Sequence, residues 1–192
     1  MNKNQRLLIA GGTGRDVGKT EFICRLIKKI TTKQSVYAIK VSAIYPDEEL
    51  YHGNHSVETP GLHLFEETNR TSDKDTSRML RAGAVKVFYL QTDNTGIKAG
   101  FDDFLQHIPE NAVVVCESNS LGQFIQPALS IMVKPVCGQI KPRAIAQLEC
   151  ANLVVVSDGL SGFPELAFIC FSKARGWKLR ANSKLGFCSV QK

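Results

Sequence analysis

Residues 7–20 read Leu7-Leu8-Ile9-Ala10-Gly11-Gly12-Thr13-Gly14-Arg15-Asp16-Val17-Gly18-Lys19-Thr20. A short apolar run leads into a glycine-rich turn, and the apolar residues from Phe22 to Ile30 that follow recur at helical spacing. Glycines permit the backbone angles that turn successive amides toward one point, and a helix N-terminus adds partial positive charge there. This order of strand, loop and helix predicts a site that holds phosphate groups.

The side chains of this loop suit nucleotide binding. The strict phosphate-loop pattern is Gly, four residues, then Gly-Lys-Ser/Thr. Counting back from Gly18 puts Thr13 at the first position, so the loop is one residue longer than standard if it begins at Gly12. Lys19 supplies positive charge to the outer phosphates, and the Thr20 hydroxyl can join the ligands of Mg²⁺. We assign nucleotide binding to Gly12, Thr13, Gly14, Arg15, Asp16, Val17, Gly18, Lys19, Thr20 and Glu21.

The rest of the chain alternates apolar, β-branched runs with amphipathic segments. The runs that predict strands are 7–10, 35–41, 84–90, 112–116, 128–133 and 152–156, and the segments that predict helices are 19–30, 73–82, 99–107 and 142–150. Such alternation is typical of a parallel sheet covered on both faces. We predict a single α/β domain over residues 1–192, with three layers and a mainly parallel central sheet of about six to seven strands.

Two segments depart from this alternation. Residues 42–72 show little periodicity and leave the carboxyl end of the second strand, where open α/β sheets bind ligands, so we predict a lid or substrate loop. His52 and His55 have no helical platform and His63 is distant from them, so we interpret all three as solvated rather than metal-binding. Residues 165–191 hold apolar runs at 166–171 and 185–190, which predict a terminal hairpin that turns near 173–178.

Three acidic residues are candidates for binding a ligand. Glu117 ends the apolar strand at 113–116, so we expect its carboxylate at the ligand edge, where Mg²⁺ needs oxygen ligands; the alternative is an ordinary acid facing water. We assign metal binding to Thr20, Glu117 and Asp75. Asp158 follows the last predicted strand, and its carboxylate could accept N1–H and N2–H₂ of guanine. The alternative for Asp158-Gly159 is a plain turn.

The helix predicted at 73–82 has a basic face. Ser72 and Asp75 fit a capping box, and Gly83 fits the stop at the other end. Lys74, Arg78 and Arg81 share one face, which is either a solvated stripe or a contact for a pterin phosphate or a partner protein.

The loop resembles those of two families. Gly12-Thr13-x-x-x-Val17-Gly18-Lys19-Thr20 resembles the loop of dethiobiotin synthetase, and molybdopterin-guanine dinucleotide biosynthesis protein B (MobB) has a similar organisation. Lys40, which ends the second strand, also resembles a lysine of both families. Lys74-Asp75-Thr76 followed by Ala82-Gly83-Ala84 is similar to the Lys-Asp-Ser and Ala-Gly-Ala of MobB proteins, at the same interval. Where both families place glycine after the glutamate that corresponds to Glu117, this chain has Ser118-Asn119.

The resemblance to MobB implies a P-loop nucleotide-binding protein that assists attachment of a guanine nucleotide to molybdopterin. It implies GTP, with ATP as the alternative, and slow hydrolysis. From the residues themselves we expect Mg²⁺ as the second cofactor, and we assign Lys19, Lys40 and Glu117 as catalytic residues. A molybdopterin derivative or the nucleotidyltransferase that uses it would be the partner, with the chain as a homodimer. Two alternatives stay open: an ATP-dependent ligase or kinase resembling dethiobiotin synthetase, and a non-catalytic nucleotide switch. The missing Glu-Gly-Ala-Gly-Gly run after the fourth strand counts against a synthetase.

Composition excludes several other classes. The 192 residues are 43% hydrophobic and 22% charged, which is globular usage, and no apolar stretch is long enough to span a membrane. The N-terminus lacks a leader pattern, so we expect a cytoplasmic protein. Six scattered cysteines predict buried, reduced thiols. No nucleic-acid-binding motif accompanies the net charge of +6, and a phosphorylated ligand is enough to explain it.

Overall fold

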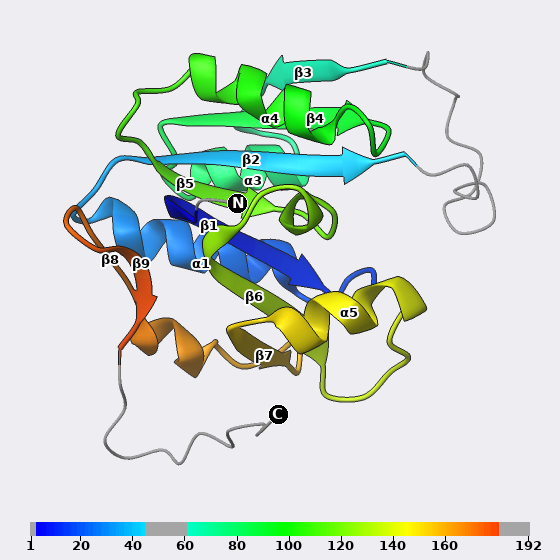
Figure 1. The fold of residues 1–192 in the computed structure, drawn as a ribbon. Coiled ribbons are helices and arrows are strands. Elements are labelled where there is room, and N and C mark those ends of the chain that lie inside the picture. The colour runs from blue at the N-terminus through cyan, green and yellow to red at the C-terminus, as the bar shows by residue number, and fades with distance from the viewer. Residues whose placement is uncertain (1–2, 45–60, 181–192) are drawn as a thin grey trace.

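The glycine-rich loop joins strand β1 (Asn4–Gly12) to helix α1 (Lys19–Thr31) in the computed structural model, which describes residues 3–44 and 61–180. The elements that follow along the chain (Figure 1) are β2 (Val36–Ala43), β3 (His63–Glu66), α3 (Asp75–Arg81), β4 (Lys86–Thr92), α4 (Ile97–Gln106), β5 (Val113–Glu117), η1 (Leu121–Gln123), β6 (Pro127–Pro135), α5 (Pro142–Cys150), β7 (Leu153–Ser157), η2 (Pro164–Phe168), β8 (Ile169–Ser172) and β9 (Gly176–Leu179).

The central sheet of the described residues has seven strands in the order β3-β4-β2-β5-β1-β6-β7. All neighbouring strands are parallel except β3, which runs antiparallel to β4. β1 lies between β5 and β6, and its residues 7–12 are all buried. A parallel strand covered on both faces needs such an unbroken apolar run. The predicted α/β fold with a mainly parallel sheet is confirmed.

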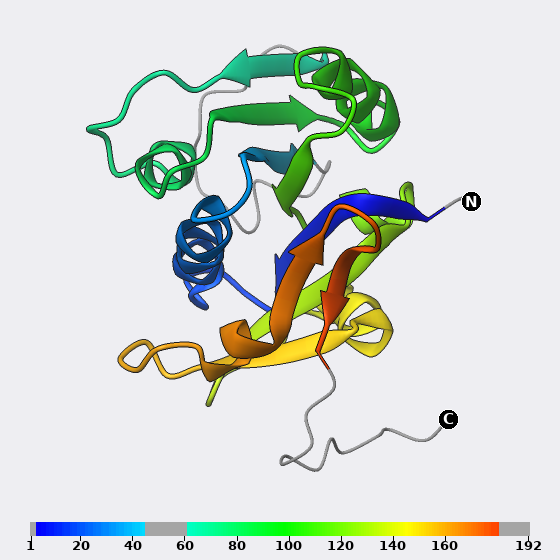
Figure 2. The same ribbon diagram turned by 90° about the vertical axis from the view of Figure 1, so that its left-hand side faces the viewer.

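Helices cover both faces of this sheet. Leu8 and Ala10 of β1 pack into one core cluster with α1 and α3, whereas Leu7 and Ile9 pack into a second cluster with α4. Figure 2 shows α1 and α3 on one side of the sheet and α4 and α5 on the other. Because side chains alternate along a strand, one short run supplies both cores. The sheet with helices on each face makes the three layers that were predicted.

The segment 42–72 is not without structure throughout. His63–Glu66 forms β3, which pairs with β4 from His63 opposite Gln91 to Glu66 opposite Phe88. An edge strand of four residues, with Phe65 and Glu66 exposed, offers too little alternation to be recognised. Residues 45–60, which include His52 and His55, lie outside the described part, and the lid or substrate role stays a prediction.

The C-terminal hairpin is shorter than predicted. β8 pairs antiparallel with β9, so the partner of the first apolar run is 176–179 and not 185–190, which lies outside the described residues. Trp177 anchors the hairpin on the sheet because its Nε1 donates to the Arg6 carbonyl at 2.8 Å and its ring is buried. Gly176 sits in the left-handed region (φ 67°), with its Cα against the backbone of Gln5, where a side chain would clash.

The five cysteines among the described residues differ in burial, and Cys170 is partly buried. Cys24 and Cys116 are buried, as predicted, and burial raises the pKa of Cys24 to about 11. Cys137 and Cys150 are exposed, so the prediction of buried thiols is wrong for both. Cys137 lies on the loop after β6 and Cys150 ends α5, a helix that buries little of its surface.

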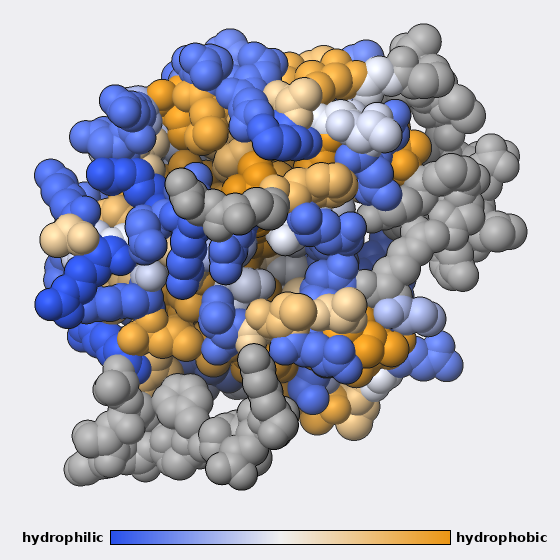
Figure 3. All heavy atoms as spheres, in the orientation of Figure 1, coloured by the Kyte–Doolittle hydropathy of each residue, from blue (hydrophilic) through white to orange (hydrophobic). Residues whose placement is uncertain are grey.

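The surface mixes charged and apolar side chains. The larger exposed apolar residues include Val136, Ile145, Val154, Val156 and Leu160, and apolar groups reach the surface near α5 in Figure 3. Among the described residues, none of the helices combines the length and the apolar content needed to cross a bilayer.

Candidate phosphate-binding site

The backbone of the loop leaves a run of amides free. The Gly12 amide donates to Asn119 Oδ1 at 2.7 Å, and the Thr13 amide donates to the Val133 carbonyl at 3.0 Å. The amides of Gly14 to Gly18 donate to no acceptor within the described residues. β1 extends through Gly12, so the loop begins at Thr13. Counted from Thr13, the loop has the standard length and not the longer one that a start at Gly12 would give. Free amides before a helix N-terminus form an anion site.

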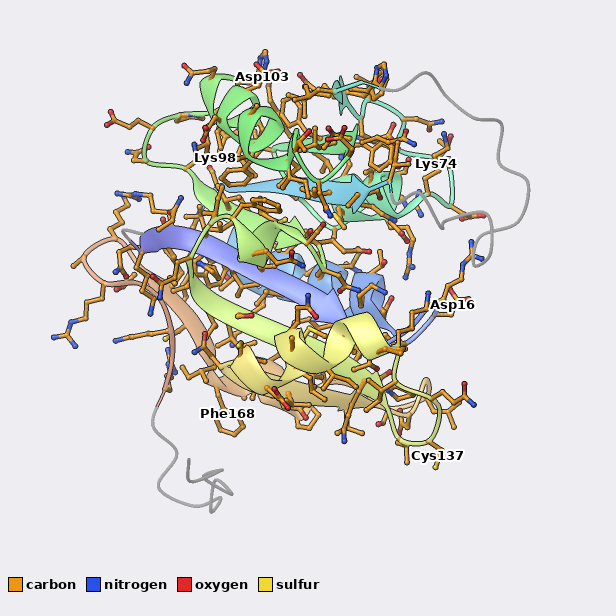
Figure 4. All side chains as sticks on the ribbon, turned by 45° about the vertical axis from the view of Figure 1, so that its right-hand side comes forward. Asp16, Lys74, Lys98, Asp103, Cys137 and Phe168 are labelled. Atoms are coloured by element: carbon orange, nitrogen blue, oxygen red, sulfur yellow. The ribbon has the colours of Figure 1, made fainter. Side chains whose placement is uncertain are left out.

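Left-handed backbone angles shape this run. Gly18 has φ 86°, and a Cβ there would lie 2.6 Å from Ser157 Oγ, which requires glycine and places the end of β7 against the loop. Asp16 has φ 53°, a conformation that short polar residues tolerate. Arg15 and Asp16 are exposed at the tip of the loop, whereas Val17 is buried. Figure 4 shows Asp16 projecting at the edge where the strands end.

Lys19 lies folded along the loop. A Cβ at Gly12 would be 2.4 Å from Lys19 Cδ, so that glycine leaves room for the lysine stem. Lys19 Nζ donates to the Gly14 carbonyl at 3.0 Å. Burial lowers the pKa of Lys19, and the Glu117 carboxylate opposes that effect. The ammonium group is therefore held within the loop, where it can meet phosphate oxygens.

Thr20 and Glu117 meet beside the loop. Thr20 Oγ1 donates to Glu117 Oε2 at 3.0 Å. β5 pairs with β1, with Glu117 opposite Ala10, so the carboxylate stands next to the start of α1. Glu117 is only 4% exposed, which rules out an ordinary acid facing water. Burial raises the pKa of Glu117 despite the opposing charges of Lys40 and Lys19.

Lys40 joins this group from β2. Its Nζ forms an ion pair with Asp75 Oδ2 and lies 3.8 Å from Glu117 Oε1. Burial disfavours the charged form of Lys40, but the carboxylates of Glu117 and Asp75 outweigh burial and raise its pKa. Burial also acts against the charged form of Asp75, but the hydrogen bond and charge of Lys40, together with Thr20 and Arg78, outweigh burial and lower the pKa of Asp75. The structure thus brings all three predicted catalytic residues and Asp75 to one edge.

Helix α3 differs from its prediction at one end. It begins at Asp75, and the Ser72 hydroxyl contacts the Ser77 hydroxyl at 2.6 Å, so Ser72 does not cap the helix and the capping box is wrong. Gly83 has φ 110° and ends the helix as predicted. The reason for the late start is that the extended backbone of Lys74 occupies the N-cap position.

Two of the three residues on the predicted basic face, Arg78 and Arg81, make contacts within the protein. Arg78 donates to Glu21 Oε2 at 2.8 Å, while Arg25 donates to Glu21 Oε1 at 2.7 Å, which ties α3 to α1. Arg81 donates to the Arg70 carbonyl at 2.9 Å. Arg78 and Arg81 are therefore not a free contact face. The carboxylate of Glu21 likewise accepts hydrogen bonds from Arg25 and Arg78, which tie it to the helices and not to the loop.

Asp158 forms the Asp-Gly turn. Its Oδ1 accepts from the amides of Leu160 and Ser161 at 2.9 and 2.8 Å, and its Oδ2 accepts from the Ser161 hydroxyl at 2.5 Å. The Ser161 hydroxyl, followed by the two amides, lowers the pKa of Asp158 to about 2. Gly159 is left-handed (φ 75°), as the turn requires. Asp158 follows Ser157, which contacts the phosphate loop at Gly18. The carboxylate of Asp158 binds only groups of its own turn among the described residues.

Sequence reasoning missed Asn119, which contacts the start of the loop. Its side chain bonds both polar groups of the Gly12 peptide, accepting from the amide at 2.7 Å and donating to the carbonyl at 3.0 Å. The only sequence signal was a departure from two families that have glycine after the corresponding glutamate. Thr13 is a second residue of note, because its buried Oγ1 has no hydrogen-bond partner in the described residues.

The similarity of this chain to known proteins is limited to solved structures. No family model matches the chain, and no curated protein matches it. The kinase domain of Escherichia coli tyrosine kinase ETK is similar at 13% identity, with a TM-score of 0.45 over 82% of this chain and 69% of that chain. The fold and the site stated above rest on the geometry of this chain alone.

Proposed function

We propose that this chain binds a nucleoside triphosphate with Mg²⁺ and hydrolyses it slowly. The observation that carries the proposal is the run of amides from Gly14 to Gly18 with no acceptor in the described residues, at the N-terminus of α1. Backbone donors, a helix dipole and the Lys19 ammonium all favour negative charge at this point. A triphosphate carries negative charge on successive phosphate groups, whose oxygens can accept hydrogen bonds from the amides of such a loop.

The side-chain oxygens beside the loop fit a magnesium ion. Mg²⁺ in such sites takes one or two protein oxygens and completes its octahedron with phosphate oxygens and water. Thr20 Oγ1 and Glu117 supply those two groups at one point. When bound, Mg²⁺ would neutralise charge on the phosphate oxygens.

Lysines flank the position of the outer phosphate. Lys19 is the first residue of α1 and folds back along the loop, and Lys40 comes from β2 and is held by Asp75 and Glu117. In phosphoryl transfer, catalysis consists mainly of positioning and of stabilising charge on the transferred group. Lys19 and Lys40 would stabilise that charge, and Glu117 would hold the magnesium ligand shell in place.

The base would lie over the loops after β6 and β7. These loops are joined by the bond from the Val136 amide to the Ser157 carbonyl at 3.1 Å, and Ser157 contacts the loop at Gly18. Val136 and Leu160 expose apolar surface there, 63% and 93% respectively, which suits a flat base. Two donors already fill Asp158 Oδ1, so bidentate pairing with guanine requires the turn to rearrange. The GTP preference therefore rests on the resemblance to MobB.

The physiological role that we propose follows the same resemblance: a MobB-like accessory factor in attaching a guanine nucleotide to molybdopterin. A second candidate is an ATP-dependent ligase or kinase resembling dethiobiotin synthetase. The placement of Lys40 and Asp75 beside Lys19 favours it, because a second substrate could meet the outer phosphate there. A non-catalytic switch would bind nucleotide and turn it over without any second substrate.

A thermal-shift panel tests the proposal. Purified protein is melted with GTP, ATP, GDP and pterins, each with Mg²⁺ and with EDTA. A ligand at a hundred times its Kd adds about 2.7 kcal/mol of stability. For a chain of this size, that raises Tm by about 5–10 °C. We expect GTP with Mg²⁺ to give the largest shift. The absence of a shift with every nucleotide would overturn nucleotide binding, and a larger shift with ATP would favour the second candidate.

A further inference from the structure

The side chain of Asn119 continues the pairing of β1 with β5 beyond the last backbone partners. The backbone ladder ends with Ala10 opposite Glu117 and the Ser118 amide bonded to the Ala10 carbonyl at 3.1 Å. Beyond that point β5 turns away into η1. The carboxamide of Asn119 then bonds the Gly12 amide and carbonyl at 2.7 and 3.0 Å, as a facing peptide group would.

The surroundings of this contact are fixed on both strands. A Cβ at Gly11 would lie 2.8 Å from Asn119 Oδ1 and 2.6 Å from Met132 Sδ, so glycine is needed for the carboxamide to fit. On the β5 side, the Ser118 hydroxyl accepts from the amides of Ser120 and Leu121 at 3.1 and 3.0 Å. The turn that carries Asn119 is thereby set by the end of β5, where Glu117 lies.

We propose that Asn119 is a positioning residue that couples the phosphate loop to the magnesium carboxylate. Asn119 stands two residues after Glu117, and its partner Gly12 stands two residues before the first free amide at Gly14. The bidentate contact of Asn119 therefore links the start of the loop to the turn after Glu117, in addition to the hydrogen bond from Thr20 to Glu117. The proposal rests on the proposed function, because the coupling matters only if the loop binds phosphate and Glu117 acts on its ion.

Two variants separate the two hydrogen bonds. Asn119→Ala removes both bonds. Asn119→Asp keeps an acceptor for the Gly12 amide but loses the donor to the Gly12 carbonyl, and it is the variant to use should the alanine protein fail to fold. Asn152→Ala is a matched control, because Asn152 Oδ1 accepts from the Ser130 amide at 2.8 Å in the same sheet, away from the loop. Hydrogen exchange of the nucleotide-free proteins should show faster exchange at Gly12 in Asn119→Ala only.

The decisive readout is the ratio of nucleotide affinity with Mg²⁺ to nucleotide affinity with EDTA, measured by calorimetry with GTP. Loss of a coupling contact should lower this ratio by about tenfold in both Asn119 variants. Asn152→Ala should leave the ratio at the wild-type value, even if its Tm falls. An unchanged ratio in folded Asn119 variants, or an equal loss in Asn152→Ala, would overturn this inference and leave the proposed function standing. If the wild-type protein binds no nucleotide, the inference and the proposed function both fail.

Discussion

Thr20 Oγ1 donates a hydrogen bond to Glu117 Oε2 at 3.0 Å, although the two residues are 97 positions apart in the chain. Thr20 lies in the first turn of α1, which follows β1 and the loop. β5 pairs with β1 and ends on Glu117, so the two side chains meet. Both side chains are buried, so the pair excludes bulk water. A hydroxyl and a carboxylate held in this way match the protein ligands that Mg²⁺ takes beside a bound triphosphate.

The first prediction concerns the charge of Glu117. Glu117→Gln keeps the size of the side chain and an oxygen for Thr20 but removes the negative charge. We expect nucleotide affinity in Mg²⁺ to fall about tenfold or more, because a hydrogen bond to a charged group contributes about 1.5–3 kcal/mol. Affinity in EDTA should change much less. Calorimetry under the two conditions checks this, and a wild-type response to Mg²⁺ would remove Glu117 from the ion site.

Much of the fold was predictable because its strands are buried on both faces. Runs such as Leu7–Ala10 and Val113–Cys116 are apolar throughout, as is typical of strands in a parallel sheet covered by helices on both faces. The exposed side chains of β3 left no comparable pattern. The partner of β8 was also missed, since a pairing between short strands depends on the anchor that Trp177 makes to Arg6 and not on local composition.

The site was predictable only where position along a strand determines it. Lys19 and Thr20 follow from the loop pattern, and Lys40 and Glu117 follow from their places at strand ends that meet one edge. Asn119 was not predictable, because its contact is made between residues 107 positions apart and depends on how β5 turns. Glu21 could not be separated from the loop by sequence, since its pairing with Arg78 appears only when α3 packs on α1.

The second prediction concerns the ion pair of Lys40 with Asp75. Their side chains are 27% and 31% exposed, so water screens the pair only in part. A double-mutant cycle with Lys40→Met and Asp75→Asn should give a coupling of about 1 kcal/mol in the free energy of unfolding of the nucleotide-free protein. Lys98 and Asp102 on α4 are the control, because that exposed pair is expected to contribute about 0.3–0.5 kcal/mol.

Urea unfolding of the single and double variants measures both couplings. The Lys40–Asp75 coupling should also fall as salt is raised, though less than that of the exposed control pair. A coupling for Lys40 and Asp75 no larger than the control value would mean that the two residues do not depend on each other in solution.

The third prediction concerns Asp158 and pH. Its folded pKa of about 2 lies below the ordinary value of 3.8, so the ionised carboxylate stabilises the folded state. That stabilisation is present above about pH 4 and is lost as pH falls toward 2. Asp158→Ala should therefore have a lower Tm than the wild type at pH 6, and the difference should shrink between pH 4 and pH 2.

Nucleotide preference distinguishes the turn role of Asp158 from a role in base recognition. If Asp158 only holds its turn, Asp158→Asn should bind GTP and ATP in the same proportion as the wild type. A specific loss of GTP affinity in Asp158→Asn would show that the turn opens and that the carboxylate reads guanine.

The measurement that tests nucleotide binding most directly is a calorimetric titration of GTP, in Mg²⁺, into the wild type, Lys19→Ala and Lys98→Ala. Lys19 sits within the loop, whereas Lys98 pairs with Asp102 on α4 and serves as the charge-matched control. We predict saturable binding to the wild type and to Lys98→Ala, with affinity reduced about tenfold to a hundredfold in Lys19→Ala. Equal affinity in all three proteins, or no binding to the wild type, would contradict the assignment of this loop as a nucleotide site.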